Sequence, residues 1–135
     1  RNDMEGGQTN EFRPLILVAE DDDSNFKLIK AIIGKKCDIQ WAKNGEEIVA
    51  LFKEYGNEAK AILMDIKMPV MNGLDATKII RGENKEIPII MQTAYAFSSD
   101  KENAMNAGAS EVLVKPITLS ILRNTLTKYF PELVW

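Results

Sequence analysis

The chain has 135 residues, of which 45% are hydrophobic and 27% are charged. These proportions are typical of a globular domain that is large enough to bury a core of its own. The net charge of −3 gives no basic footprint for nucleic acid. No apolar run approaches the roughly 20 residues that cross a bilayer. The chain has no histidine, which excludes histidine metal sites, Ser-His-Asp triads and Cys-His nucleophiles.

Residues 1–13 are polar and show neither helical nor strand periodicity, so we expect a linker or tail there. The segment lacks the apolar stretch of a signal peptide. Residues 14–135 are expected to form a single domain. Cys37 is the only cysteine and cannot form a disulfide within the chain, which fits a reducing, cytoplasmic compartment.

After Pro14 the hydrophobic pattern alternates between strands and helices. Most of the expected strands are short apolar runs, typical of strands buried on both faces, and they are predicted over 15–19, 38–42, 61–64, 87–92 and 112–114. Polar caps, glycine stops and helical spacing predict helices from the Ser24 cap to Gly34, from the Asn44-Gly45 turn to Gly56, over 74–81, over 100–107, and from about Thr118 to Tyr129.

This alternation predicts the α/β class: a single doubly wound, flavodoxin-like parallel sheet of five strands, flanked by five helices. Right-handed crossovers, with the first strand placed centrally, give the strand order 2-1-3-4-5. Ligands of such sheets bind at the carboxyl ends of the strands, beside the reversal between strands 1 and 3.

Polar side chains follow four of the predicted strands at those carboxyl ends: Glu20 with Asp21, Asp65, Thr93, and Lys115. Close carboxylates raise one another's pKa unless a cation lies between them, and their oxygens are the ligands that Mg²⁺ prefers. The acidic run 20–23 alone would favour a solvated loop beside a helix N-terminus. Its pairing with Asp65 at a neighbouring strand end favours a metal site instead.

Lys115 offers an ammonium that would neutralise a phosphoryl group on Asp65, and Thr93 offers a hydroxyl that would donate to it. Taken singly, each has an ordinary explanation: a surface lysine that closes a strand, and a threonine with high strand propensity. Their shared sheet edge favours a phosphoryl-accepting aspartate with a bound cation.

The segment 62–73, Ile-Leu-Met-Asp-Ile-Lys-Met-Pro-Val-Met-Asn-Gly, resembles the receiver domains of response regulators in two-component signalling. The resemblance extends from Leu15 to about Phe130. It also includes the acids after the first strand, Thr93-Ala94 and Lys115-Pro116. The residue sequence around Asp65, together with Asn25 at the start of the first helix, is most similar to receivers of hybrid histidine kinases.

This resemblance implies phosphorelay signal transduction, in which Asp65 accepts a phosphoryl group and later loses it by self-catalysed dephosphorylation. It also implies Mg²⁺, or Mn²⁺, bound by Asp21, Asp65 and the backbone carbonyl of Lys67, with Glu20 acting through water. The phosphoryl group would be contacted by Lys115 and Thr93. Such a domain is a phosphoacceptor and not an enzyme acting on other molecules.

The same resemblance implies a phosphodonor outside this chain, either a histidine kinase or a histidine phosphotransfer domain. It implies no contact of this domain with nucleic acid or membrane, and a cytoplasmic location that includes the cytoplasmic part of a membrane-bound sensor kinase. Switching is expected in the face made by residues 100–107, 112–114 and the last helix. That face is also the candidate surface for a homodimer.

Val112 departs from the family, which usually has an aromatic residue there that is coupled to movement of the threonine. Tyr95 and Phe97, two aromatics in a loop expected to be exposed, are candidates to take over part of that readout. Lys67 and Tyr95 lie two residues beyond the acceptor and the threonine, where they would border the path of attacking water. We predict that they tune the lifetime of the phosphoryl group.

Three alternatives are weighed against this interpretation. A hydrolase of the aspartyl-phosphate type typically has a second aspartate two residues after the first, where this chain has Lys67. A nucleotide-binding Rossmann domain would need a glycine-rich turn after the first strand, where this chain has the acids 20–23. A module that only docks a partner would not need the intact set of acids, threonine and lysine.

Overall fold

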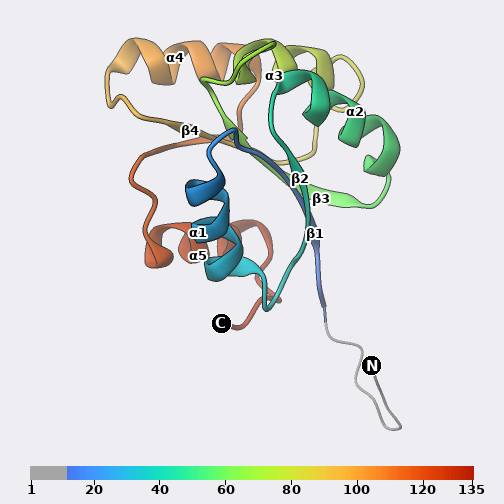
Figure 1. The fold of residues 1–135 in the computed structure, drawn as a ribbon. Coiled ribbons are helices and arrows are strands. Elements are labelled where there is room, and N and C mark those ends of the chain that lie inside the picture. Colours follow the sequence, from blue (N-terminus) through green and yellow to red (C-terminus); the bar gives the residue numbers. More distant parts are fainter. Residues whose placement is uncertain (1–11) are drawn as a thin grey trace, which may run out of the picture.

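The fold is a parallel sheet of five strands in the order β2-β1-β3-β4-β5, with the first strand in the interior of the sheet (Figure 1). The computed structural model describes residues 12–135, apart from the side chain of Ser98, so most of the expected tail at 1–13 lies outside the described residues. In chain order the elements are β1 (Leu15–Ala19), α1 (Asp23–Ile33), β2 (Asp38–Ala42), α2 (Gly45–Tyr55), β3 (Ala59–Asp65), α3 (Gly73–Arg81), β4 (Ile89–Thr93), α4 (Ser98–Ala107), β5 (Glu111–Val114) and α5 (Leu119–Tyr129).

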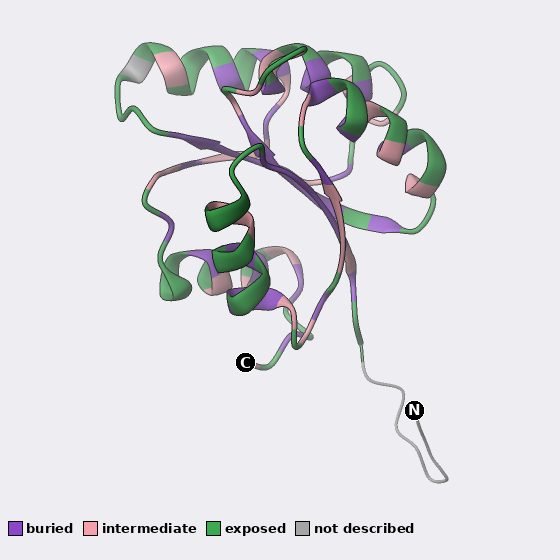
Figure 2. Ribbon diagram, in the orientation of Figure 1, coloured by how far each residue is buried: buried purple, intermediate pink, exposed green. Residues whose placement is uncertain are grey.

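The sheet separates two helical layers, α1 with α5 on one face and α2, α3 and α4 on the other. Neighbouring strand residues point to opposite faces, so each central strand contributes to two hydrophobic cores. In β1, Val18 packs in the core under α1 and α5, and Leu17 packs in the other core. The central strands are therefore buried almost throughout, as Figure 2 shows. The predicted fold class and strand order are confirmed.

Short polar side chains fix where the helices begin. Asn44, Asn72 and Thr118 each accept a hydrogen bond from a backbone N–H in the first turn of α2, α3 and α5. The prediction that Ser24 caps α1 is wrong. The cap is Asp22, whose carboxylate accepts from the backbone N–H groups of Ser24 and Asn25. Residues 20–23 therefore form a structured turn into α1.

Several element boundaries differ from the sequence expectation by one or two residues. β3 is longer than 61–64 and includes Asp65 as its last residue. β4 begins at Ile89 and not at 87, because Pro88 has no N–H for the ladder and the N–H of Ile87 donates to the side chain of Asn84. α4 begins at Ser98, two residues before the expected start. Within residues 12–135, no helix has the length and apolar character needed to cross a membrane.

Candidate phosphoryl and metal site

The sheet brings the predicted site residues together at the carboxyl ends of its strands. Asp65 ends β3 and Thr93 ends β4, while Glu20 and Lys115 directly follow β1 and β5. In the strand register Asp65 lies beside Gln92 in β4, so the backbone of Asp65 is fixed by the ladder between the two strands. Side chains that the sequence places up to 95 positions apart therefore meet over one sheet edge because the strands are parallel and in register.

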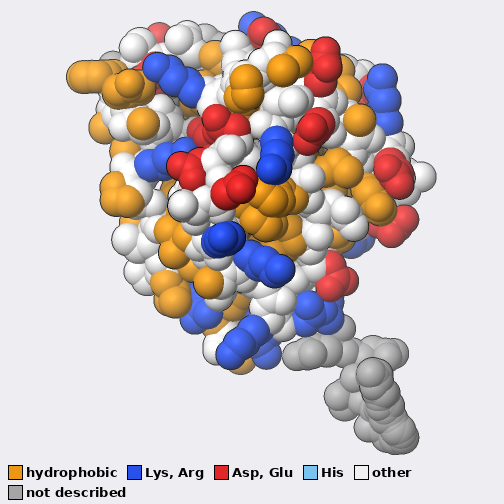
Figure 3. Space-filling model, in the orientation of Figure 1, with side chains coloured by type: hydrophobic (Ala, Val, Ile, Leu, Met, Phe, Trp, Pro, Cys, Tyr) orange, Lys and Arg blue, Asp and Glu red, His pale blue; other side chains and the backbone are white. Residues whose placement is uncertain are grey.

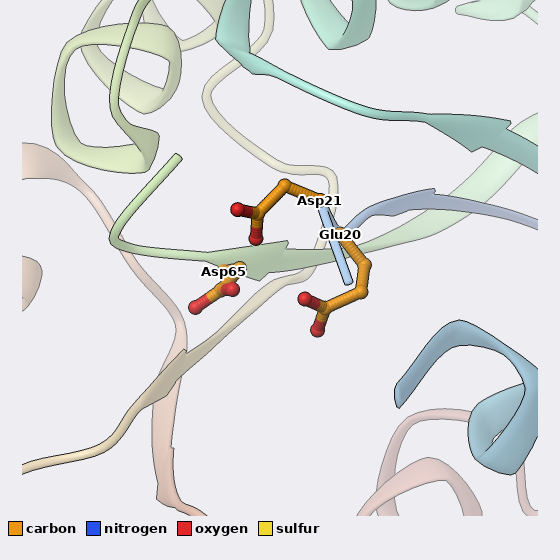
Figure 4. Close-up of side chains that lie close together, drawn as sticks. All are labelled: Glu20, Asp21 and Asp65. Atoms are coloured by element: carbon orange, nitrogen blue, oxygen red, sulfur yellow. The ribbon is translucent and has the colours of Figure 1, made fainter. Parts of the chain in front are cut away.

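Three carboxylates converge at this edge. Oxygen atoms of Glu20, Asp21 and Asp65 all lie within 4.8 Å of one another (Figure 4). Glu20 is fully buried and Asp65 is 5% exposed, whereas Asp21 is exposed. Acidic side chains gather on this face around the loop after β1 (Figure 3). Such a group of hard oxygen ligands, partly buried and of one charge, has the chemistry that suits Mg²⁺.

The carboxylate of Glu20 has hydrogen-bond partners for both of its oxygen atoms. Its Oε1 accepts a hydrogen bond from the side-chain amide of Asn25, and its Oε2 accepts from the backbone N–H of Asp22 at 3.2 Å. The pKa of Glu20 is raised to about 7, chiefly by burial and also by the charge of Asp65, against the opposing effects of Asn25, Lys115 and the backbone N–H of Asp22. A dication beside these carboxylates would favour the ionised form of Glu20.

Lys115 is the positive charge of the site. Its Nζ lies 3.0 Å from Oδ2 of Asp65 and 3.5 Å from Oε1 of Glu20. Burial lowers the pKa of Lys115, but the hydrogen bonds and charges of Asp65 and Glu20 together outweigh that effect, and the pKa is raised. Lys115 is therefore a fixed cation within reach of any group that Asp65 carries. The peptide bond between Lys115 and Pro116 is cis.

Thr93, Lys67 and Tyr95 line the rim of the same site. Oγ1 of Thr93, which is 4% exposed, accepts the backbone N–H of Tyr95 at 3.1 Å. The Nζ of Lys67 lies 4.7 Å from the centre of the Tyr95 ring, a cation–π contact. An open cleft of about 260 Å³ is lined by these three residues and by the carboxylates and Lys115. The cleft leaves room for a small anion above Asp65.

Some residues that shape the site were not singled out for this role from the sequence. Asn25 was noted only through the family resemblance, although it binds Glu20 directly. Trp41 donates its indole N–H to the backbone carbonyl of Glu20 at 2.8 Å. Gln92 lies beside Asp65 in the ladder, and its side-chain amide is buried. The contacts of Asn25 and Trp41 cross between elements, and local sequence patterns carry no signal for such contacts.

The fold and site together define a flavodoxin-like α/β domain with an acidic cluster and a lysine at the carboxyl edge of its sheet. The family described as "Response regulator receiver domain" matches residues 16–127, and the chain belongs to this family. It is thus a phosphoacceptor module of phosphorelay signalling. The suspected resemblance is confirmed.

The chain is 38% identical over 129 residues to hybrid signal transduction histidine kinase I of Dictyostelium discoideum, covering 87% of this chain and 7% of that protein. It spans only 4% of the related kinase G of the same organism. Among solved structures, it is similar to the receiver domain of sensor histidine kinase PA1611 from Pseudomonas aeruginosa, whose active-site cleft coordinates a magnesium ion. The TM-score is 0.81 at 30% identity, covering 89% of this chain and 99% of that one.

A second similar structure is the Saccharomyces cerevisiae receiver domain of Ssk1 in complex with the histidine phosphotransfer protein Ypd1. The TM-score is 0.81 at 28% identity, covering 90% of this chain and 93% of that one. Members of this fold thus occur with a metal ion in the cleft and with a phosphotransfer partner.

Proposed function

We propose that Asp65 accepts a phosphoryl group from a phosphohistidine of a partner, with Mg²⁺ or Mn²⁺ bound beside it. The observation that carries this proposal is the pairing of charges around one carboxylate. Asp65 lies 3.0 Å from the ammonium of Lys115 and within 4.8 Å of the two acids after β1. Neither an ordinary ion pair nor a solvated loop requires both features at one strand end.

The reaction is a transfer between two nucleophiles. An oxygen of Asp65 forms a bond to phosphorus while the P–N bond of the phosphohistidine breaks and its electron pair returns to the imidazole. A cation held by Asp21, Asp65 and the Lys67 carbonyl, with Glu20 acting through water, would supply charge neutralisation to the phosphoryl oxygens. Lys115 would keep its position and exchange its carboxylate partner for a phosphoryl oxygen.

Thr93 would complete the contacts to the phosphoryl group. Its Oγ1 accepts from Tyr95 N–H, and a hydroxyl oxygen that accepts can still donate its own hydrogen. Donation to a phosphoryl oxygen would draw the loop between β4 and α4 toward the site. The face of α4, β5 and α5 would thereby respond to phosphorylation. Met105 on α4 and Leu119 on α5 are exposed on this face, as a homodimer surface would require. The homodimer itself stays a prediction.

The partner supplies the phosphohistidine because this chain contains no histidine. We propose a histidine kinase or histidine phosphotransfer domain as that partner, supported by the phosphotransfer complex of a similar receiver. A cytoplasmic location, as part of a longer kinase or as a separate regulator, agrees with both kinds of partner. The net charge of −3 supports the absence of nucleic-acid contact by this domain.

The first experiment incubates the protein with Mg²⁺ and a small acyl-phosphate donor and measures the mass of the intact chain. We expect addition of one phosphoryl group to the wild type and none to Asp65→Asn or to wild type in EDTA. Incorporation that persists in Asp65→Asn would contradict the proposal. Multiple-turnover hydrolysis of phosphoesters would instead favour the hydrolase alternative, even though this chain has Lys67 where such hydrolases typically have a second aspartate.

The contact of Lys67 with Tyr95 supports their predicted control of phosphoryl lifetime, because it places both side chains at the mouth of the cleft. Removing either side chain opens the approach of water to the acyl phosphate. We expect Lys67→Ala and Tyr95→Ala each to speed dephosphorylation severalfold, measured as loss of phosphoprotein after the donor is removed. Leu28→Ala, an exposed substitution on α1, serves as the control. Unchanged rates in both rim variants would contradict this assignment.

A further inference from the structure

The backbone of Glu20 is anchored to the neighbouring strand β2 at two points, one through its N–H and one through its carbonyl. The backbone N–H of Glu20 donates to the carbonyl of Ala42 at 2.9 Å, which extends the β1–β2 ladder by one bond. The backbone carbonyl of Glu20 accepts the indole N–H of Trp41 at 2.8 Å. That carbonyl belongs to the same peptide plane as the N–H of Asp21, so the indole restrains the backbone from which the Asp21 side chain projects.

The indole is itself held in place from two elements. The ring of Phe26 in α1 stacks on it with a centroid distance of 4.0 Å and an interplanar angle of 1°. The ammonium of Lys43 lies over the indole, 4.7 Å from its centroid, and 3.5 Å from Oδ1 of Asp23. The Trp41 donor therefore belongs to a cluster that joins β2 to the first turn of α1, with the acidic loop between them.

Without such an anchor, electrostatic repulsion would favour a conformation in which the acidic loop after β1 moves away from Asp65. Glu20, Asp21 and Asp65 carry like charges within 4.8 Å, and their repulsion opposes the arrangement that would bind a cation. Asp21 is exposed, so burial does not hold its side chain in the site. A hydrogen bond to the preceding carbonyl supplies that restraint at the backbone. Folding thereby supplies the free energy needed to bring the carboxylates together, so the site is already arranged before a cation binds.

We propose that Trp41 is a positioning residue for the metal site, whose indole N–H holds the Glu20–Asp21 peptide so that the carboxylates of Glu20 and Asp21 converge with that of Asp65. This inference rests on the proposed binding of Mg²⁺ by these residues. Trp41 touches neither the cation nor the phosphoryl group; it acts only through the Glu20 carbonyl. Its loss should weaken Mg²⁺ binding while the protein stays folded.

The test measures the dissociation constant of Mg²⁺ by calorimetry at 25 °C for the wild type, Trp41→Phe and Trp135→Phe. Phenylalanine keeps an aromatic ring against Phe26 but cannot donate to Glu20. We expect Trp41→Phe to bind Mg²⁺ about three- to tenfold more weakly, as for loss of one hydrogen bond. Trp135→Phe is a matched control, because that indole N–H also makes one hydrogen bond, to Thr127, and its ring also contacts a cation, Arg123.

Thermal unfolding in EDTA checks that each variant is folded at 25 °C, so that a loss of stability alone cannot account for a change in the measured affinity. Equal Mg²⁺ affinity of Trp41→Phe and wild type would overturn the inference and leave the proposed function intact. A wild type that does not bind Mg²⁺ would instead overturn the proposed function.

A second measurement needs no variant at position 41. Coupling is reciprocal, so Mg²⁺ should strengthen the indole hydrogen bond by the factor by which that bond strengthens Mg²⁺ binding. We expect saturating Mg²⁺ to slow hydrogen exchange at the Trp41 indole N–H about three- to tenfold, and to leave the Trp135 indole unchanged. Equal exchange at Trp41 with and without Mg²⁺ would also overturn the inference.

Discussion

Gln92 has a buried side-chain amide and lies beside Asp65 in the strand register. It is 2% exposed, and neither Oε1 nor Nε2 has a hydrogen-bond partner among the described residues. The alternation of β4 points it to the same face as Ile90, which packs in the core under α1 and α5. A buried polar group without a partner lowers the stability of the fold, so such a group at a site is explained by a function and not by stability.

We therefore expect Gln92→Met, which keeps the length of the side chain and removes both polar atoms, to raise the free energy of unfolding by about 1–3 kcal/mol. Urea unfolding checks this value. Gln40→Met is the matched control, because Gln40 lies half-buried in the edge strand β2, and we expect it to change stability little. A lower stability of Gln92→Met would mean that the amide is satisfied in solution, for example by a buried water molecule.

The site residues differ in how well the sequence predicts them. Asp65 and Lys115 follow apolar strands, so their positions in the chain suffice to place them at one sheet edge, and the structure brings them to 3.0 Å. Trp41 and Asn25 lack such a signal. Each acts through a side chain that reaches across to another element, and that reach depends on packing and not on periodicity.

At the scale of the elements, the cores of the strands and helices follow from the sequence, and their ends follow less well. Ser24 and Asp22 are both good caps in isolation, and the choice between them depends on the turn that leads from the buried Glu20 into α1. The start of α4 is equally weakly encoded. The backbone carbonyl of Phe97 accepts from Asp100 N–H, and Phe97, which occupies the N-cap position, makes no side-chain capping hydrogen bond. Local competition of this kind decides boundaries within two residues.

The strand order of the whole molecule is predictable because few arrangements satisfy right-handed crossovers with a central first strand. The energetic balance of the site is not predictable in this way. The fold fully buries Glu20 beside Asp65, with Lys115 and Asn25 as partial compensation. In the absence of a cation, this arrangement should reduce the stability of the entire domain, because the ionised form of Glu20 is disfavoured in the fold.

The sign of this effect follows from the pKa of Glu20, which burial raises from an ordinary value of 4.5 to about 7. A raised pKa stabilises the fold below pH 4.5, and that contribution is lost as the pH rises through about 7. At pH 8 in EDTA we expect Glu20→Gln to raise the melting temperature by several degrees, since about 1 kcal/mol corresponds to roughly 4 °C in a domain of this size. At pH 5.5 the difference should shrink, because Glu20 of the wild type is then protonated in the fold.

Mg²⁺ should reverse the order of the melting temperatures of wild type and Glu20→Gln if Glu20 serves the metal site. A ligand that binds only the folded state stabilises it in proportion to its affinity, so saturating Mg²⁺ at pH 8 should raise the melting temperature of the wild type more than that of Glu20→Gln. Differential scanning fluorimetry in EDTA and in Mg²⁺ measures both shifts. Glu102→Gln, at an exposed position of α4, should change neither shift. A wild type that is more stable than Glu20→Gln in EDTA at pH 8 would contradict the argument, because the buried carboxylate would then be favourable without a cation.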